Sequence, residues 1–260
     1  MNSSTSPLWF VFYKDQILLE KRGDSLRIPS GDIPPVEPEK ETNIHEISLP
    51  DDICFKAFSI PTPIEESVRY TMIGLRASYD FIPLKYYKMG GKAAEILHWD
   101  QNSRFCSACG TLMEQKDPIM KKCPSCSREV YPAISTAVLV LIRKEDSILL
   151  VHAHNFSGPF HSLVAGFLET GESLEECVHR EVKEETRLEI SNITYFGSQP
   201  WPYPSGLMVG FIADYVSGDI QLQDEELSEG AFYTRNNLPQ LPRKLSLARK
   251  MIDWWMENLS

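Results

Sequence analysis

The sequence predicts an α+β protein of three segments, and three observations lead to this prediction. Short apolar runs bounded by turn residues indicate strands before residue 99 and after residue 131. A longer run with apolar residues at helical spacing indicates a helix that begins near residue 173. Four cysteines in two close pairs separate these regions. We therefore expect an N-terminal α+β domain over residues 1–99, a four-cysteine module over 100–130 and a larger domain over 131–260.

The composition is that of an ordinary globular protein. Hydrophobic residues make up 42% of the 260 residues and charged residues 24%, which excludes a disordered or fibrous chain. No apolar run approaches the roughly 20 residues that cross a bilayer, and the first residues lack the basic segment and apolar core of an export signal. We therefore expect a cytoplasmic protein without a membrane partner. Its net charge of −10 disfavours indiscriminate binding of nucleic acids.

The N-terminal segment predicts strands followed by a helix. The apolar runs at residues 9–13 and 17–19 are typical of strands, and the proline-rich stretch 33–38 interrupts the pattern. Residues 92–99 indicate a short helix that leads into the cysteines. These features predict a small α+β domain, but they leave its topology open.

The cysteines predict a zinc site. Cys106 and Cys109 form one pair, Cys123 and Cys126 the other, and thirteen residues separate the pairs. A gap of two residues lets both thiolates of a pair turn toward one point, so the two pairs together can hold Zn²⁺ tetrahedrally. The alternative is disulfide bonding, which a reducing compartment disfavours. Because four thiolates leave no open coordination position, this zinc would be structural.

The third segment begins with a predicted hairpin and continues to a helix rich in glutamate. Apolar residues 137–142 and 148–151 flank a polar turn. Further on, Ser173 and Glu176 have the spacing of a capping box, which marks the start of a helix. On that helix three glutamates would project within an arc of about 100°, and apolar residues would occupy the neighbouring side. The three glutamates are Glu181, Glu184 and Glu185.

Three carboxylates on one face repel one another unless cations lie among them. Carboxylate oxygens are typical ligands of Mg²⁺ and Mn²⁺, which also bind waters and substrate phosphates. The alternative is a solvated acidic face, in which Arg180 would pair with Glu176 and Glu184 one turn away. The glutamates alone do not decide between the two interpretations.

The wider spacing resembles the Nudix box, the loop-helix-loop signature of hydrolases that act on compounds containing a nucleoside diphosphate. Gly166 is followed after five residues by Glu172 and, after seven more, by the run Arg-Glu-Val-x-Glu-Glu at 180–185. One position differs, because Arg187 stands before Leu188 where the pattern has glycine. That glycine normally ends the helix in a left-handed conformation, which would cost an arginine about 1 kcal/mol.

The resemblance implies the Nudix fold, a mixed sheet between helices, and metal-dependent cleavage of a diphosphate. It implies that Glu181, Glu184 and Glu185 bind Mg²⁺ or Mn²⁺, that the carbonyl of Ala165 contacts the metal, and that Arg180 orients the carboxylates. Bound cations would neutralise the diphosphate and activate a water molecule. Which glutamate acts as the base stays open.

A proline-rich segment after the helix narrows the resemblance. Ser-Gln-Pro-Trp-Pro-Tyr-Pro at 198–204 is too stiff for a central strand. Its aromatic rings suit either stacking on a base or packing in a surface groove. The related pattern Ser-Gln-Pro-Trp-Pro-Phe-Pro, behind a four-cysteine zinc ribbon and an N-terminal domain, is the arrangement of the NADH pyrophosphatase (NAD-capped RNA hydrolase) subfamily. Where that subfamily has a serine after this segment, the chain has Gly206.

The subfamily resemblance implies further site residues. Glu226 would complete the metal site, with Glu229 as a second candidate. Phe167 and Tyr131 would sandwich a base, and Arg76 would contact substrate. The remaining implied substrate contacts are Gln199, Pro200, Trp201, Pro202, Tyr203, Pro204, Ser205, Gly206 and the backbone of Ala248. Members of the subfamily are homodimers that share the pocket, so the resemblance also implies a homodimer.

The resemblance implies an enzyme that splits NADH or NAD⁺ into AMP and nicotinamide mononucleotide. The same bond occurs in the NAD cap at the 5′ end of some RNAs, which makes a capped RNA a second expected substrate. One alternative is a hydrolase of another nucleoside diphosphate derivative, such as ADP-ribose or a dinucleoside polyphosphate. The other is a sensor that binds a dinucleotide without cutting it, which only Arg187 and Gly206 favour.

Overall fold

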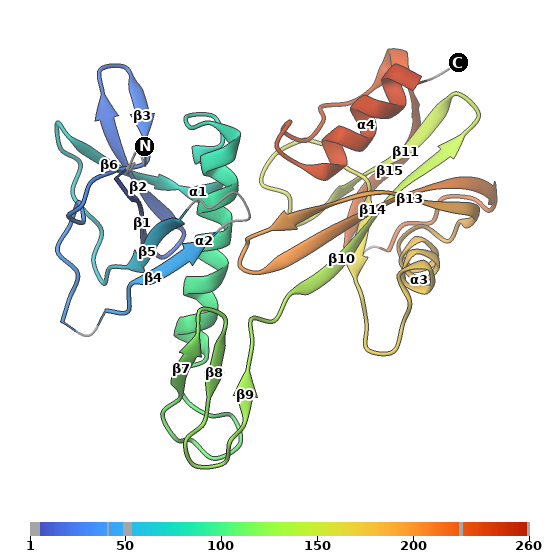
Figure 1. The fold of residues 1–260 in the computed structure, drawn as a ribbon. Helices are drawn as coiled ribbons and strands as arrows, with labels where there is room; N and C mark the ends of the chain where they lie inside the picture. Colours follow the sequence, from blue (N-terminus) through green and yellow to red (C-terminus); the bar gives the residue numbers. More distant parts are fainter. Residues whose placement is uncertain (1–5, 41, 49–53, 224–225, 259–260) are drawn as a thin grey trace, which may run out of the picture. The chain divides into compact units, whose positions relative to one another are not determined.

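The computed structural model describes residues 6–40, 42–48, 54–223 and 226–258. The chain divides into two compact units (Figure 1). The first unit comprises Met1–Ala133 together with Pro202–Ser205, and the second comprises Ile134–Trp201 together with Gly206–Ser260. None of the helices in these described ranges is long and apolar enough to cross a membrane.

The first unit contains a six-stranded sheet in which β1 and β5 are parallel and the other pairs are antiparallel. The strand order is β3-β2-β1-β5-β4, and β6 pairs with β2. The strands are β1 (Leu8–Tyr13), β2 (Gln16–Arg22), β3 (Ser25–Arg27), β4 (His45–Ser48), β5 (Cys54–Ser59) and β6 (Tyr70–Gly74). The predicted strands at 9–13 and 17–19 are confirmed as parts of β1 and β2.

Two helices follow this sheet, α1 (Leu75–Ser78) and α2 (Leu84–Asn102). The predicted helix at 92–99 is confirmed, but α2 starts eight residues earlier than expected. Gly90 and Gly91 lie in the middle of α2, and glycine is a poor helix former. The local sequence therefore does not indicate the first half of this helix. Gly90 is useful there because a Cβ atom would lie 3.2 Å from a methyl carbon of Leu75. Packing against the sheet therefore overrides local propensity.

The four-cysteine module folds as a three-stranded antiparallel sheet, β7 (Glu114–Asp117), β8 (Met120–Lys122) and β9 (Glu129–Val130). Its small core contains the buried Cys106, Met113 and Cys123. With so little apolar area to bury, a module of this size needs a metal or a covalent link to stay folded.

The second unit contains a mixed six-stranded sheet of order β13-β14-β10-β11-β15, with β12 paired to β10. Only β10 and β14 are parallel. The strands are β10 (Ser135–Lys144), β11 (Ser147–Ala153), β12 (Val164–Phe167), β13 (Glu189–Trp201), β14 (Gly206–Ser217) and β15 (Leu227–Thr234). The predicted hairpin is confirmed as β10 and β11, and the proline-rich segment ends an edge strand, as its prolines require.

Two helices cover the opposite faces of this sheet, as Figure 1 shows for α3 (Leu174–Thr186) and α4 (Leu247–Asn258). Successive residues of a strand point to opposite faces. Val138 and Val140 therefore join the core beneath α3, and Leu139 and Leu141 join the core beneath α4. This arrangement is the mixed sheet between helices that the sequence predicts, and α3 is the helix that carries the three glutamates. A short 3₁₀ turn (Arg235–Asn237) follows β15.

Candidate functional site

The helix α3 begins and ends as its capping residues dictate. The hydroxyl of Ser173 accepts a hydrogen bond from the Glu176 amide at 3.2 Å, and the Glu176 carboxylate accepts one from the Ser173 amide at 2.7 Å. This confirms the predicted capping box. At the other end Arg187 adopts the left-handed conformation, with φ of 61°, and its amide donates to the Lys183 carbonyl. Arg187 therefore ends the helix in the same left-handed conformation that glycine normally adopts at this position.

The carboxylates of α3 form a crowded, partly buried cluster. Glu181 and Glu185 are 8% and 3% exposed. Burial, reinforced by the nearby charges of Glu181, Glu226 and Glu184, raises the pKa of Glu185 to about 8. Burial also raises the pKa of Glu181, although Arg180 opposes that shift. One oxygen of Glu185 is buried without a hydrogen-bond partner. A buried carboxylate oxygen without a hydrogen-bond donor is energetically costly unless a cation binds it. This oxygen is therefore a candidate metal ligand.

A single guanidinium holds these carboxylates in place. Arg180 donates to Glu172 at 2.5 and 3.0 Å, to Glu181 at 2.8 Å and to Glu184 at 3.1 Å. It also donates to the Phe167 carbonyl at 2.9 Å. The hydrogen bond from Arg180 lowers the pKa of Glu172 to about 2. The alternative pairing of Arg180 with Glu176 is therefore wrong, because Glu176 is occupied by the helix cap.

The strand beside α3 approaches the carboxylates closely. Gly166 lies on β12, and a Cβ atom there would lie 1.8 Å from the carboxyl carbon of Glu181. Only glycine fits this position. Ala165 precedes Gly166 on the same strand, opposite Leu139 of β10. The close approach of β12 and α3 is at Gly166.

Two acidic residues near the start of β15 have different surroundings. Glu226 raises the pKa values of both Glu181 and Glu185, so it belongs to the cluster. Glu229 accepts a hydrogen bond from Nε2 of the buried His161 at 3.1 Å, and it is not among the groups that raise the pKa of Glu185. Glu226 is therefore the better of the two candidates for metal binding. No local pattern indicates a role for His161, because its partner lies 68 residues away.

The residues of the cluster fit a hard divalent cation. Glu181, Glu184 and Glu226 all raise the pKa of Glu185, and one oxygen of Glu185 has no hydrogen-bond partner. Within the described ranges, only the four cysteines bring three or more ligand atoms within 4.8 Å of one another. The glutamate oxygens do not meet this distance. In this arrangement one or two carboxylates would bind Mg²⁺ or Mn²⁺ directly and the others through its bound waters, which is usual for Mg²⁺.

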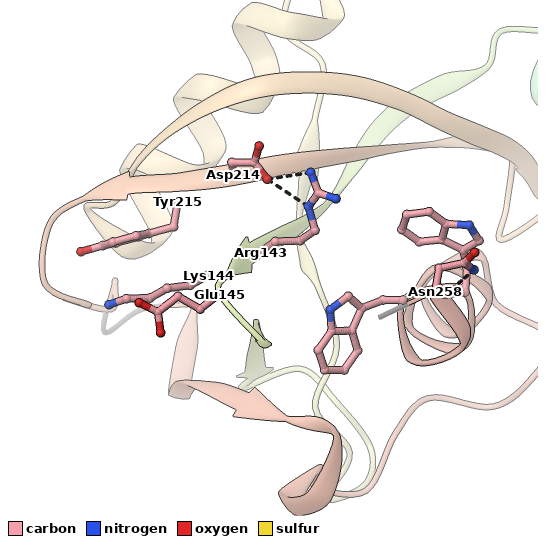
Figure 2. A pocket seen from close by; sticks show the side chains of 8 residues that line it. Arg143, Lys144, Glu145, Asp214, Tyr215 and Asn258 are labelled. Atoms are coloured by element: carbon pink, nitrogen blue, oxygen red, sulfur yellow. Dashed lines mark hydrogen bonds and ion pairs between the residues drawn. The ribbon is translucent and has the colours of Figure 1, made fainter. Parts of the chain in front are cut away.

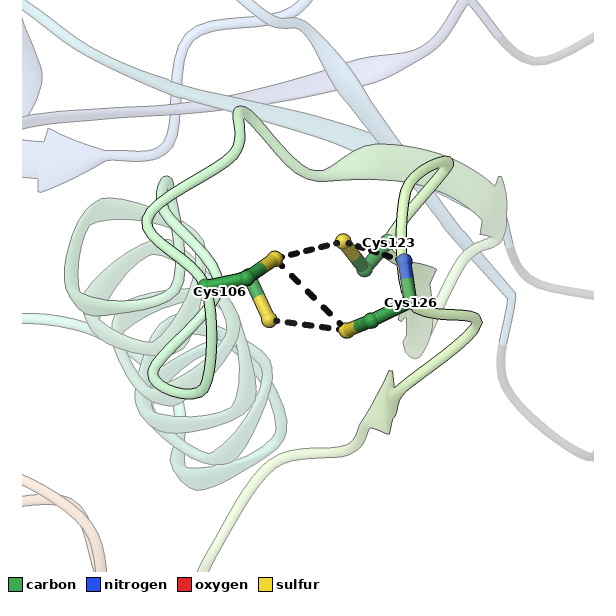
Figure 3. A group of neighbouring side chains, drawn as sticks. Cys106, Cys123 and Cys126 are labelled. Carbon is green, nitrogen blue, oxygen red and sulfur yellow. Dashed lines mark hydrogen bonds between the residues drawn. The ribbon is translucent and has the colours of Figure 1, made fainter.

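The four cysteines form a compact metal site (Figure 3). Their sulfur atoms approach one another at 3.5 Å for Cys106 and Cys126, 3.5 Å for Cys109 and Cys123, and 3.6 Å for Cys109 and Cys126. A disulfide needs about 2.05 Å, so these thiols are not paired. Four sulfurs at about 2.3 Å from a common centre have separations of this order. The geometry confirms the predicted structural zinc site over the disulfide alternative.

The proline-rich segment runs along β13 and turns into β14. Gln199 is held at both ends, because its oxygen accepts from the Lys250 ammonium at 2.6 Å and its amide donates to the Leu245 carbonyl at 3.0 Å. Gly206 pairs with Trp201 across the two strands, and a Cβ atom on it would lie 3.1 Å from the Trp201 carbonyl oxygen. A side chain at position 206 would therefore require this carbonyl to shift by a few tenths of an ångström.

The other implied substrate residues are distributed over both units. Phe167 of the second unit is 66% exposed and Tyr131 of the first is 53% exposed, so each presents a ring to solvent. In the first unit, Arg76 lies 5.8 Å from the ring of Tyr203. Ala248 is buried in the core beneath α4. That burial leaves only its backbone for the contact that the resemblance implies.

A separate hollow of about 500 Å³ lies at the far end of β10, between the β10–β11 turn and the end of α4 (Figure 2). Its cationic group Arg143 is bound to Asp214 at 2.7 Å, and the Lys144 ammonium lies 4.1 Å from the Tyr215 ring. None of the candidate site residues lines it. This hollow is therefore separate from the carboxylate cluster.

Comparison with known proteins identifies similar sequences and folds. The NUDIX domain matches residues 133–255, the NADH pyrophosphatase-like rudimentary NUDIX domain matches 6–99, and the NADH pyrophosphatase zinc ribbon domain matches 101–131. The NAD-capped RNA hydrolase NudC of Pseudomonas aeruginosa is 42% identical over 66% of this chain, but that match spans only 62% of the relative's length. NudC of Chromobacterium violaceum is 38% identical over 68% of each chain.

Among solved structures, a NUDIX hydrolase from Nitrosomonas europaea has a similar fold. Its TM-score is 0.50 at 22% identity, and the match covers 59% of this chain and 90% of that one. At this level of identity the likeness concerns the fold alone.

Proposed function

This chain belongs to the NUDIX family, in the group that joins a NUDIX domain to an NADH pyrophosphatase-like domain and a zinc ribbon, and on that premise we propose that it hydrolyses NADH or NAD⁺. One water molecule adds across the diphosphate. The bond from one phosphorus to the bridging oxygen breaks, and AMP and nicotinamide mononucleotide leave as phosphate monoesters. The observation that supports this most directly is the buried, mutually repelling set of carboxylates around Glu185.

The proposed roles follow from the contacts within the cluster. Glu181, Glu184, Glu185, Glu226 and the Ala165 carbonyl would hold Mg²⁺ or Mn²⁺, which supplies the positive charge that neutralises a diphosphate. Arg180 keeps three of the acidic side chains in place through its hydrogen bonds. The burial of Glu181 and Glu185 excludes bulk water from part of the site, which strengthens their attraction for a cation.

The substrate contacts belong to the same proposal. The strand residues Gln199, Pro200, Trp201 and Gly206, with the turn between them, would line the dinucleotide pocket. Phe167 and Tyr131 would stack on a base, and Arg76 and the Ala248 backbone would contact the remainder of the ligand. We also propose the domain division 1–99, 100–130 and 131–260, a homodimer and a cytoplasmic location.

Removal of the NAD cap from RNA is part of the proposed activity. The relatives that match 66–68% of this chain carry the name NAD-capped RNA hydrolase. The cap presents the same diphosphate to the site. The net charge of −10 makes strong affinity for the body of an RNA unexpected.

Product analysis tests the proposal. We would incubate the purified protein with Mn²⁺ or Mg²⁺ and compare NADH, NAD⁺, ADP-ribose, a dinucleoside polyphosphate and an NAD-capped RNA, reading the products by mass. Release of AMP from NADH with the highest kcat/KM would support the proposal. Preference for another nucleotide would favour the wider hydrolase alternative, and tight binding of NAD⁺ without turnover would favour a sensor.

A further inference from the structure

The turn between β13 and β14 packs on the N-terminal domain. The strands on either side of this turn belong to the second unit, but the turn itself, Pro202–Ser205, belongs to the first unit. Pro202 is buried against α2, where a Cβ atom on Gly91 would lie only 3.0 Å from Cγ of Pro202. The absence of a side chain at Gly91 therefore allows the turn to lie directly on the helix.

Polar contacts fix the rest of the turn. The Tyr203 hydroxyl lies 2.5 Å from the Tyr87 hydroxyl of α2, and the Arg76 guanidinium lies 5.8 Å from the Tyr203 ring. The Ser205 hydroxyl donates to the Ala133 carbonyl at 2.8 Å. The pattern of the subfamily has phenylalanine at position 203, which has no hydroxyl. The pairing with Tyr87 is thus a contact that this chain adds.

We propose that the N-terminal domain positions the substrate-binding turn, with Tyr87 and Gly91 as positioning residues; the inference rests on the proposed function for its effect on substrate. The turn connects Trp201 directly to Gly206, which pair across the two strands. A shift of the turn therefore moves both of these proposed pocket residues.

A cavity beside the turn explains why these few contacts matter. It has a volume of about 520 Å³. Pro202, Tyr203 and Pro204 line one side, and residues of the first sheet and α2 line the other. Because this side of the turn borders open space, packing alone does not fix its position. The hydroxyl pair and the contact at Gly91 supply the missing restraint.

Hydrogen exchange of the nucleotide-free protein tests the restraint itself. In Tyr87→Phe we expect the amides between the prolines of residues 199–206 to exchange about threefold to tenfold faster, the range that corresponds to losing one hydrogen bond. These amides belong to Gln199, Trp201, Tyr203, Ser205 and Gly206. The matched control is Tyr86→Phe, since the Tyr86 hydroxyl makes no hydrogen bond within the described residues. It should leave the exchange unchanged.

Steady-state kinetics test the consequence for substrate. We expect Tyr87→Phe and Gly91→Ala to raise KM for NADH about threefold to tenfold with kcat nearly unchanged. Gly90→Ala is the control for Gly91→Ala, because its new methyl group would meet Leu75 and Ile17 inside the domain and not the turn. It should lower thermal stability without raising KM.

Unchanged exchange and unchanged KM in both Tyr87→Phe and Gly91→Ala would overturn the inference. So would equal KM increases in Gly90→Ala and Gly91→Ala, which would indicate general destabilisation. If the wild-type protein cleaves none of the nucleotides, the proposed function fails, but the exchange of residues 199–206 still decides whether the domain restrains the turn.

Discussion

At the scale of single residues, Glu185 shows how burial prepares a carboxylate for a cation. The side chain is 3% exposed, three other glutamates raise its pKa, and one of its oxygens has no donor. An arrangement of this kind destabilises a metal-free protein and is compensated when a dication binds. In the metal-free protein, hydrogen bonds from Arg180 hold Glu181 and Glu184 in place despite their like charges.

Glu184→Gln should reduce kcat by orders of magnitude and leave the fold intact. The Glu184 side chain is 52% exposed, so the amide costs little packing, but it removes one charged ligand from the cluster. The control is Glu175→Gln, an exposed change in the first turn of the same helix. Turnover of the Glu184 variant near the wild-type rate would show that the metal assignment is wrong.

The stability of the metal-free protein should fall as the pH rises. The pKa of Glu185 is raised from 4.5 to about 8, so the folded state retains a proton that the unfolded state has released. The contribution is fully present below pH 4.5 and is lost as the pH rises through about 8, with a slope of at most about 1.4 kcal/mol per pH unit. Denaturant titrations between pH 5 and pH 8 in a chelator measure this slope. Glu185→Gln should flatten it; an unchanged slope would assign the effect to another group.

At the scale of secondary-structure elements, the sequence predicted what local spacing determines. The capping box, the acidic face of α3 and the cysteine pairs depend on neighbours a few residues away, and all three are confirmed. The first half of α2 was missed because two glycines conceal it. The pairing of Arg180 with Glu172 was missed because a loop-to-helix contact has no fixed spacing. Contacts such as Tyr87 with Tyr203 join residues 116 positions apart, which no local pattern reveals.

Arg187→Gly should stabilise the second unit. Arg187 ends α3 with φ of 61°, a conformation that costs a residue with a side chain about 1 kcal/mol and costs glycine nothing in the folded state. Part of that gain is offset by the greater freedom of glycine in the unfolded chain, so we expect an increase in the free energy of unfolding of about 0.5 kcal/mol. Chemical denaturation measures it. Arg187→Ala is the comparison, since alanine keeps the strain, and equal stabilities of the two variants would exclude this explanation.

At the scale of the whole molecule, a few specific contacts join segments that are far apart in the sequence. The turn at 202–205 reaches the N-terminal domain, and the zinc ribbon is joined to the end of α2 by the buried Lys121. The Lys121 ammonium lies 2.6 Å from the Asp100 carboxylate and donates to the Asp100 carbonyl at 2.8 Å. A buried ammonium is costly to leave without its partners, so the ribbon and α2 should be stable or unstable together.

Zinc removal should therefore unfold the ribbon and loosen the end of α2, while the carboxylate helix stays folded. We expect about one zinc ion per chain, released by a strong chelator, and faster hydrogen exchange at residues 96–130 after its removal. Exchange in α3 should be unchanged, because its core contacts lie within the second unit. Cys123→Ser should reproduce the effect, and Cys177→Ala, which removes a buried thiol outside the zinc site, should retain the metal. Full zinc content in Cys123→Ser, or equal loss of protection in α3, would show that the ribbon is not an independent metal-dependent part of the fold.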